Sequence, residues 1–208
     1  MIGYIAFEGI DGSGKDTQLL RLADAFNREG TTPIVLHEPS YGHHGRAVRA
    51  ALADLPTDVA RQRELFTSDR RDHAQRKITP ALSFVRTTPG FVLLQNRSAI
   101  SAAAYQPLGD ADEDLRWTVD EQSALTPMPD IIILLDVDVA TAIRRIASRG
   151  TLHSLERADV LESVRERYLR IAALRRDVVV IDARGDPDDV AQAIRRAVGT
   201  FGDGRGLA

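Results

Sequence analysis

Residues 7–18 of the chain read FEGIDGSGKDTQ, and within them Gly9, Gly14 and Lys15 stand in the spacing G-x-x-x-x-G-K. An apolar run precedes this stretch and a helical pattern follows it. This is the context of a P-loop, the glycine-rich turn between a strand and a helix that binds the phosphates of a nucleotide. The residues predicted to bind ATP in this loop are Gly9, Gly12, Ser13, Gly14, Lys15, Asp16 and Thr17.

The chemistry of the loop depends on its backbone and on one lysine. Glycines allow successive N–H groups to turn inward around an anion, and the start of the following helix adds partial positive charge. Only two of the 27 basic residues, Lys15 and Lys77, are lysine. A chain this rich in arginine that keeps lysine inside a tight turn indicates that the position requires a compact ammonium group. Lys15 would neutralise charge on the transferred phosphoryl group.

One position departs from the P-loop pattern. The residue after the lysine is usually Ser or Thr, whose hydroxyl binds Mg²⁺, but here it is Asp16. A carboxylate is a competent ligand for Mg²⁺, although it adds negative charge beside the phosphates. An acidic residue is also favourable in the first turn of any helix. The sequence supports both explanations.

Short β-rich runs alternate with longer helical stretches along the chain. The predicted strands are Gly3–Phe7, Pro33–Leu36, Phe91–Leu94, Ile131–Leu135 and Val178–Ile181. The predicted helices are Lys15–Arg28, Gly45–Leu55, Asp58–Thr79, Ala140–Ser148, Leu155–Leu174 and Pro187–Val198. This alternation favours the three-layer α/β sandwich of P-loop NTPases, a five-stranded parallel sheet with helices on both faces. Ligands of such sheets bind at the carboxyl ends of the strands.

Length and composition narrow the class of protein. The 208 residues suit one domain over residues 1–208, with a frayed tail at 202–208. The absence of cysteine excludes disulfides, thiolate catalysis and cysteine zinc sites. The net charge of −3 without a basic tail argues against a nucleic-acid binder. The start Ile2–Phe7 is too short for a signal peptide, and Ile131–Leu135 is too short to span a membrane. We expect a soluble cytoplasmic protein.

Two charged blocks stand out. Residues 61–86 carry seven basic residues against three acidic ones, and residues 110–121 carry six acidic residues against one arginine. A solvated surface is the default interpretation of both blocks. The basic block also stands where a phosphate could be bound.

The opening FEGIDGSGK resembles that of the thymidylate (dTMP) kinases, which are P-loop nucleoside monophosphate kinases. Further resemblances to this family follow in the same order along the chain, over about residues 3–198. They are His37-Glu38-Pro39-Ser40, Leu65-Phe66-x-x-Asp69-Arg70, Asn96-Arg97, Ala104-Tyr105-Gln106, Pro129-Asp130 and Arg149-Gly150. The ordered set is far more specific than the P-loop alone.

The resemblance implies transfer of the γ-phosphate of ATP to dTMP, giving dTDP and ADP, with Mg²⁺. It implies that Asp11 hydrogen-bonds the sugar 3′-hydroxyl, that Phe66 stacks on the pyrimidine and that Arg70 reaches the base edge. Arg97 would bind the acceptor phosphate, and Tyr105 would lie under the sugar and disfavour a 2′-hydroxyl.

Further expectations follow from the same resemblance. It implies dTMP contacts from Glu38, Pro39 and Gln106, and it places Arg149 near the adenine of ATP. It also implies a small mobile lid at about residues 149–157 and a homodimer, with no role for nucleic acid or membrane.

Two departures from the family pattern concern the metal. Asn96 replaces the acid that usually precedes Arg97, while Asp16 adds an acid in the P-loop. The local formal charge is therefore unchanged, which suggests that the carboxylate that organises Mg²⁺ has moved. Asp16 and Asn96 are the predicted metal residues, and Lys15, Arg97 and Asp16 are the predicted catalytic residues.

Another departure concerns an arginine. Members of the family carry an arginine that reaches the transferring phosphate from the P-loop or from the lid. Here the P-loop offers Gly12, and Ser154 stands in the lid where arginine is often found. Arg149 and Arg157 are the candidates to replace it.

Two alternatives accompany the prediction of a dTMP kinase. One is a kinase for another deoxypyrimidine monophosphate, dUMP or a 5-substituted form, because a methyl-sized difference discriminates by only about 1–3 kcal/mol. The other is a nucleotide-binding homologue with impaired catalysis. Asp16, Asn96 and Ser154 favour this second alternative, and Lys15 and Arg97 argue against it.

Overall fold

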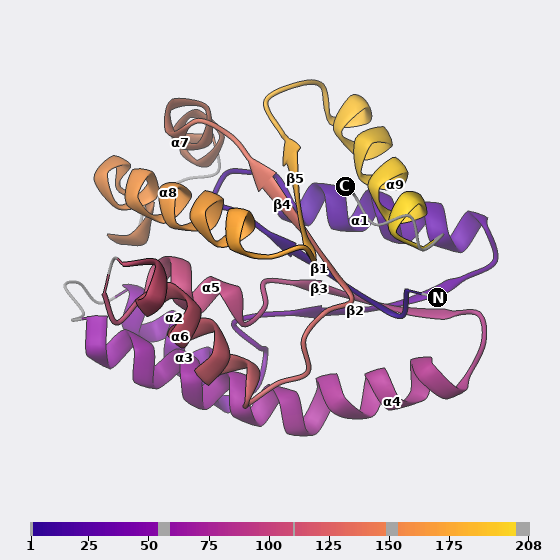
Figure 1. The fold of residues 1–208 in the computed structure, drawn as a ribbon, viewed down its shortest axis with the longest axis horizontal. Coiled ribbons are helices and arrows are strands. Elements are labelled where there is room, and N and C mark those ends of the chain that lie inside the picture. The colour runs from indigo at the N-terminus through magenta and orange to yellow at the C-terminus, as the bar shows by residue number, and fades with distance from the viewer. Residues whose placement is uncertain (1, 54–58, 110, 149–153, 203–208) are drawn as a thin grey trace.

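The computed structural model describes residues 2–53, 59–109, 111–148 and 154–202. Its centre is a five-stranded parallel sheet in the order β2-β3-β1-β4-β5 (Figure 1). The strands are β1 (Tyr4–Glu8), β2 (Thr32–His37), β3 (Phe91–Asn96), β4 (Ile131–Asp136) and β5 (Val178–Asp182). Because β1 lies between β3 and β4, the P-loop that follows it lies at the middle of one sheet edge.

Helices connect the strands. The α-helices in the described part are α1 (Lys15–Arg28), α2 (His43–Ala53), α3 (Val59–His73), α4 (Thr79–Thr87), α5 (Ile100–Tyr105), α6 (Asp112–Ser123), α7 (Val139–Ala147), α8 (Ala158–Leu174) and α9 (Pro187–Gly202). A π-helical turn, η1 (Ala74–Ile78), joins α3 to α4, and a 3₁₀ turn, η2 (Ser154–Glu156), precedes α8. None of the helices in these ranges is long and apolar enough to cross a bilayer.

The first strand shows how the sheet is covered on both faces. Side chains alternate along a strand, so Ile5 and Phe7 point to one face, where they pack with Leu19 of α1 and with α9 (Figure 1). Tyr4 points to the opposite face and packs on η1 and α4, and Ala6 packs near α5 and α8. All four are buried, and each large apolar side chain stabilises the fold by about 1.5–3 kcal/mol.

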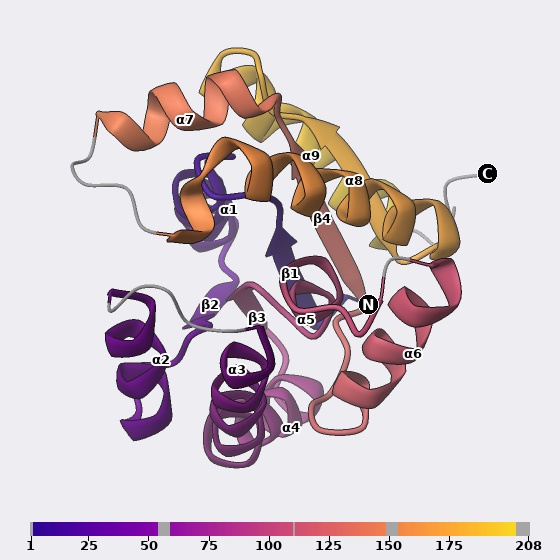
Figure 2. The ribbon, with the colours of Figure 1, turned by 90° about the vertical axis from the view of Figure 1, so that its left-hand side faces the viewer.

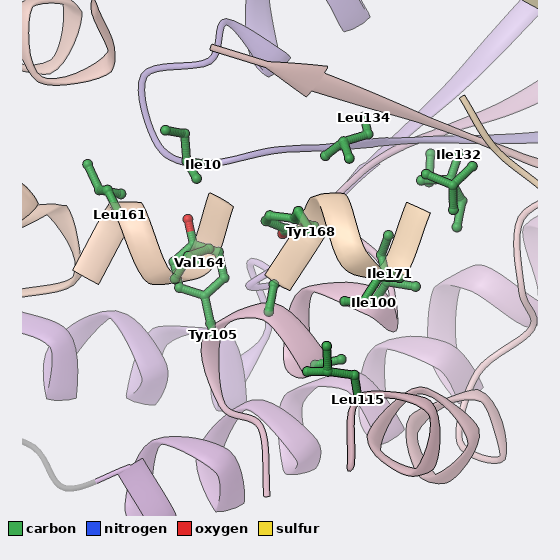
Figure 3. Close-up of a cluster of buried hydrophobic side chains, with 14 of the residues drawn as sticks. Ile10, Ile100, Tyr105, Leu115, Ile132, Leu134, Leu161, Val164, Tyr168 and Ile171 are labelled. Atoms are coloured by element: carbon green, nitrogen blue, oxygen red, sulfur yellow. The ribbon is translucent and has the colours of Figure 1, made fainter. Parts of the chain in front are cut away.

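The core on the second face includes two tyrosines that also reach the site. Figure 3 shows Tyr105 at the end of α5 and Tyr168 on α8 among Ile10, Leu134 and other apolar side chains. Their rings meet edge to face with centroids 6.2 Å apart. The wall of the site is therefore continuous with the core.

The predicted fold is confirmed, with five parallel strands at the expected places. The predicted helix Asp58–Thr79 was too short, because the helical run continues through η1 and α4 to Thr87. The interpretation of residues 110–121 as solvated surface is correct for most of those that the structure describes, but Leu115, Thr118 and Val119 are buried. Residues 112–123 form α6, which buries Leu115, Val119 and Gln122 and exposes its acidic side chains. The α5 helix was also missed.

Parts of two expectations lie outside the described residues. The predicted lid at 149–157 includes residues 149–153, and the predicted frayed tail includes residues 203–208. Figure 2 shows α7, which precedes residues 149–153, and the segment leading into α8, which follows them.

Candidate active site

The P-loop folds as its glycines permit. Gly9, Gly12 and Gly14 have φ angles of 137°, 82° and 94°, in the region that side-chain-bearing residues rarely adopt. The Nζ atom of Lys15 donates hydrogen bonds of 2.9 Å to the carbonyl oxygens of Gly9 and Ile10. These bonds hold the lysine across its own loop, where only 6% of its surface is exposed.

The charge of Lys15 is sensitive to its surroundings. Burial, followed by the nearby charge of Arg97, lowers the pKa of the Lys15 ammonium from 10.5 to about 8. Asp11, whose carboxylate lies 3.8 Å away, opposes this shift. A phosphate beside the lysine would favour its charged form in the same way, because opposite charges stabilise each other.

Two cavities adjoin at the ends of the central strands. The smaller, of about 250 Å³, is lined by Asp11, Gly12, Gly14, Lys15, Asp16, His37, Glu38, Pro39, Tyr41, Arg49, Asn96, Arg97 and Glu156. The larger, of about 400 Å³, is lined by Asp11, Glu38, Pro39, Arg49, Leu52, Phe66, Arg70, Arg97, Ser101, Tyr105, Gln106 and Leu155. Five residues are common to both walls: Asp11, Glu38, Pro39, Arg49 and Arg97. The P-loop thus opens into a second, deeper chamber.

Arg97 stands between the two cavities on an unusual backbone. Its φ angle is 68°, a left-handed conformation that is uncommon outside glycine. The neighbouring peptides are held by hydrogen bonds, from Arg97 N to Phe7 O (2.9 Å) and from Ser98 N to Glu8 Oε1 (2.6 Å). Strained residues persist where the surroundings hold them, and they concentrate at functional sites.

The guanidinium of Arg97 is anchored to one carboxylate. Its Nη2 atom lies 2.5 Å from Asp11 Oδ1 and 3.2 Å from the Tyr105 hydroxyl, which also donates to Asp11. Burial alone would raise the pKa of Asp11, but the charges of Arg97 and Lys15 lower it to about 2. Burial raises the pKa of the Tyr105 hydroxyl above its ordinary value. Near neutral pH, Asp11 is therefore an anion and Tyr105 a neutral donor.

The far end of the larger cavity holds a buried ion pair. Arg70 is only 2% exposed and donates from Nε and Nη2 to Glu38 Oε2, at 3.0 and 2.8 Å. Its Nη1 donates to Gln122 Oε1 at 2.7 Å. Burial alone would raise the pKa of Glu38, but the charge of Arg70 keeps it below its ordinary value. A buried guanidinium that is hydrogen-bonded at each of its three nitrogens holds its orientation well.

Phe66 and Gln106 complete this end of the cavity. Phe66 precedes Arg70 by one turn of α3, and both line the cavity. Arg63 of the same helix donates to the carbonyl oxygen of Gln106 at 2.9 Å, which fastens Gln106 beside Phe66. Among the described residues, the buried Nε2 atom of Gln106 has no hydrogen-bond partner.

Asp16 and Asn96, the positions at which a carboxylate is gained and lost relative to the family pattern, lie in direct contact. Asn96 Nδ2 donates a 2.6 Å hydrogen bond to Asp16 Oδ1, and His37 Nδ1 lies 3.8 Å from the same oxygen. Asp16 is 64% exposed and faces the smaller cavity, whereas Asn96 is buried. The Oδ1 atom of Asn96 is buried without a hydrogen-bond partner in the described part of the chain.

Most of the predicted site residues line one of these cavities, but some do not. Ser13 and Thr17 belong to the loop and the first turn of α1, outside both walls. Arg157 pairs with Asp159 on the surface. Arg149 lies outside the described residues.

Sequence reasoning missed several residues of the site, among them Glu8 and Arg49. Glu8 is fully buried and accepts hydrogen bonds from the side chains of Ser98, Ser101 and Tyr168, which come from three different segments. Arg49 lines both cavities and donates to the carbonyl oxygens of Pro39 and Ser40. Arg49 lies one helical turn after Gly45, the start of the predicted helix Gly45–Leu55. This position on the helix was the signal that could have identified Arg49.

Comparison with known proteins identifies the family of the chain. A family model described as thymidylate kinase matches residues 7–194. A probable thymidylate kinase of Methanosarcina acetivorans is 32% identical over 202 residues, which cover 95% of each chain. The chain belongs to the thymidylate kinase family. One from Pyrobaculum calidifontis is 37% identical over 196 residues, covering 92% of this chain and 93% of the relative. A thymidylate kinase of Desulfotalea psychrophila is 38% identical over 166 residues, which are 77% of each chain.

In this member of the thymidylate kinase family, the P-loop packs directly on α7. A Cβ atom added at Gly12 would lie 2.4 Å from the carbonyl oxygen of Ala142. Arg145 of the same helix donates to Gly12 O at 3.4 Å and to Ala183 O, after β5, at 3.0 Å. Glycine at position 12 therefore serves close packing, and α7 joins the P-loop to the segment that follows β5.

Proposed function

We propose that this protein transfers the γ-phosphate of ATP to dTMP, giving ADP and dTDP. The observation that carries the proposal is the junction of the two cavities at Arg97 and Asp11. Phosphoryl transfer requires two anionic substrates held in line, and catalysis comes mostly from their positioning and from charge neutralisation. The P-loop cavity would hold the triphosphate, and the larger cavity the monophosphate.

The larger cavity has the features that a pyrimidine nucleotide requires. Phe66 would stack on the flat base, while Arg70 and the unpartnered amide of Gln106 would donate to its carbonyl oxygens. Asp11 would accept from the sugar 3′-hydroxyl, and Tyr105 would lie under the sugar. Glu38 and Pro39 would close the side of the cavity.

The phosphates would meet at the junction. Arg97, whose planar fork suits a terminal phosphate, would bind the acceptor phosphate. Lys15 would neutralise the charge that moves during transfer, and the backbone N–H groups from Gly9 to Thr17 would surround the ATP phosphates. Arg149 would lie near the adenine, and Arg149 or Arg157 would supply the lid charge.

The family implies Mg²⁺, and the residues present fit it. Asp16 offers an exposed carboxylate to the P-loop cavity, and Asn96 lines the same cavity with a buried amide oxygen that has no partner among the described residues. Mg²⁺ prefers oxygen ligands and usually binds through one or two protein groups plus substrate phosphates. Bound there, it would neutralise phosphate charge, while Asn96 holds the carboxylate of Asp16 in place.

The wider expectations belong to the same proposal. The chain would act as one kinase domain over residues 1–208, with a lid at about 149–157, as a cytoplasmic homodimer. Size-exclusion chromatography with light scattering would test the dimer.

An ADP-release assay with a panel of acceptors tests the function. ATP and Mg²⁺ would be combined with dTMP, dUMP, dCMP, UMP or dGMP, using Lys15→Ala as the control. We expect the highest kcat/KM with dTMP. A higher value with dUMP would replace the substrate assignment. Turnover no greater than that of Lys15→Ala with every acceptor, from protein that still binds ATP, would contradict the proposal and favour an impaired homologue.

A further inference from the structure

A third side chain faces the carboxylate of Asp16. His37 ends β2 and Asn96 ends β3, and the two are register partners in the sheet. Both line the smaller cavity together with Asp16, and His37 Nδ1 lies 3.8 Å from Asp16 Oδ1. An imidazole nitrogen and a carboxylate oxygen therefore lie close together beside the P-loop, and the amide nitrogen of Asn96 donates to the same carboxylate.

The spacing of these groups suits a shared divalent ion. Two donors that each lie about 2.1 Å from one ion are roughly 3.0 Å apart at a right angle and about 4.2 Å apart when opposed. The distance of 3.8 Å between His37 Nδ1 and Asp16 Oδ1 falls between these limits. The 2.6 Å hydrogen bond from Asn96 Nδ2 to the same oxygen holds the carboxylate of Asp16 beside His37.

The donor set also indicates which kind of ion. Mg²⁺ takes oxygen ligands, whereas imidazole suits first-row transition ions. In the described part of the chain, no group of three or more His, Cys, Asp or Glu residues could hold a metal by itself. The remaining ligands must therefore come from elsewhere, and the nucleotide phosphates in the same cavity are the available oxygen donors.

We propose that His37 and Asp16, with Asn96 holding the carboxylate in place, form a mixed nitrogen–oxygen site that binds a first-row transition ion as its complex with the nucleotide, for which Mn²⁺ is the spectroscopic probe. The inference rests on the proposed nucleotide site. The nitrogen ligand strengthens the binding of transition ions but adds little for Mg²⁺. The protein then discriminates between metal–nucleotide complexes through the last residue of a strand, outside the P-loop.

Electron spin-echo spectroscopy of the full-length protein with Mn²⁺ and ADP tests this site, because it detects nitrogen bound to manganese. His37→Gln removes the imidazole, and His43→Gln is the matched control, since His43 is exposed at the start of α2 and lines neither cavity. We expect an imidazole signal from the wild type and from His43→Gln, and none from His37→Gln. His37→Gln should also bind Mn²⁺–ADP at least tenfold more weakly, with Mg²⁺–ADP affected less than threefold.

Two results would overturn the site. One is the absence of a nitrogen signal from wild-type protein saturated with Mn²⁺–ADP, and the other is an unchanged signal in folded His37→Gln. The acceptor assay with Mg²⁺ separates this failure from failure of the kinase function. Turnover of dTMP without a nitrogen signal would reject only the mixed site. A nitrogen signal without turnover of any acceptor would reject only the kinase.

Discussion

Arg97 Nη2 and Asp11 Oδ1 lie 2.5 Å apart at the wall that separates the two cavities. The carboxylate fixes one edge of the guanidinium, and the ring of Tyr105 lies against it with 4.7 Å between the guanidinium carbon and the ring centroid. The arginine is therefore oriented by the protein before any phosphate binds. Such preorganisation lowers the cost of aligning the acceptor.

Arg97→Lys tests this arrangement. Lysine keeps the charge but lacks the planar fork, so it cannot hold Asp11 and a phosphate in the same geometry. We expect kcat/KM for dTMP to fall by about 10²-fold, while the Kd for ADP changes less than threefold. The control is Arg195→Lys, whose arginine pairs with Glu29 on the surface. Equal losses in the two variants would contradict the role of Arg97.

Exchanging the side chains at positions 16 and 96 tests whether the carboxylate that organises Mg²⁺ has moved from position 96 to position 16. Asp16→Thr alone removes the only carboxylate of the contacting pair, and Asn96→Asp alone places two carboxylates in contact. Both single variants should lose Mg²⁺-dependent turnover. The double variant restores one carboxylate and one neutral group, and we expect it to recover activity. An equal loss of turnover in all three variants would reject the idea that the carboxylate has moved.

The pKa of Lys15 predicts a pH dependence of nucleotide binding. The free protein binds phosphate through the charged ammonium, whose pKa is about 8. As the pH rises from 7 to 9 the charged fraction falls about tenfold, and the Kd for ADP should rise by about the same factor. Lys15→Ala has no group at this position that titrates over this range. Calorimetric titration should show a flat profile for it; an equally steep profile would implicate another group.

Alanine substitutions at two P-loop glycines distinguish the cost of backbone strain from the cost of steric crowding. Gly12 and Gly14 both have positive φ, but an added Cβ meets Ala142 O only at Gly12, and no described atom within 4 Å at Gly14. Gly14→Ala should cost about 1–2 kcal/mol of unfolding free energy from strain alone. Gly12→Ala should cost about 1–3 kcal/mol more. Urea denaturation of the two variants measures the difference, and similar values would mean that α7 moves away freely.

Local patterns predicted the parts of the site that lie within a few residues of one motif. The P-loop spacing located Lys15, and the family resemblance located Asn96 and Arg97. Both follow a predicted strand, and parallel strands end at a common edge. The helix α6 also carried a usable pattern. Its buried Leu115, Val119 and Gln122 follow helical spacing, but the acidic residues between them obscured it.

Other features depend on contacts between distant segments. In the sequence, Glu8 is only the residue that ends an apolar strand. Its hydrogen-bond partners lie 90, 93 and 160 residues away. The α5 helix buries all six of its residues, so it has no polar face to give a helical period. The contact of Asp16 with Asn96 was suggested only as an exchange of charge. Its distance, and the approach of His37, required the folded sheet.

The buried pair of Arg70 and Glu38 has an electrical consequence for how an acceptor lies in the cavity. The pair is neutral as a whole, so the base end of the larger cavity carries almost no net charge. At the opposite end, Arg97 and Arg49 both face the junction, and Lys15 lies in the adjoining cavity beyond it. The carboxylates of Asp11 and Asp16 line the same walls and offset part of this positive charge. The inward N–H groups of the P-loop add partial positive charge at that end, so the uncharged base and the dianionic phosphate of an acceptor suit opposite ends of the cavity.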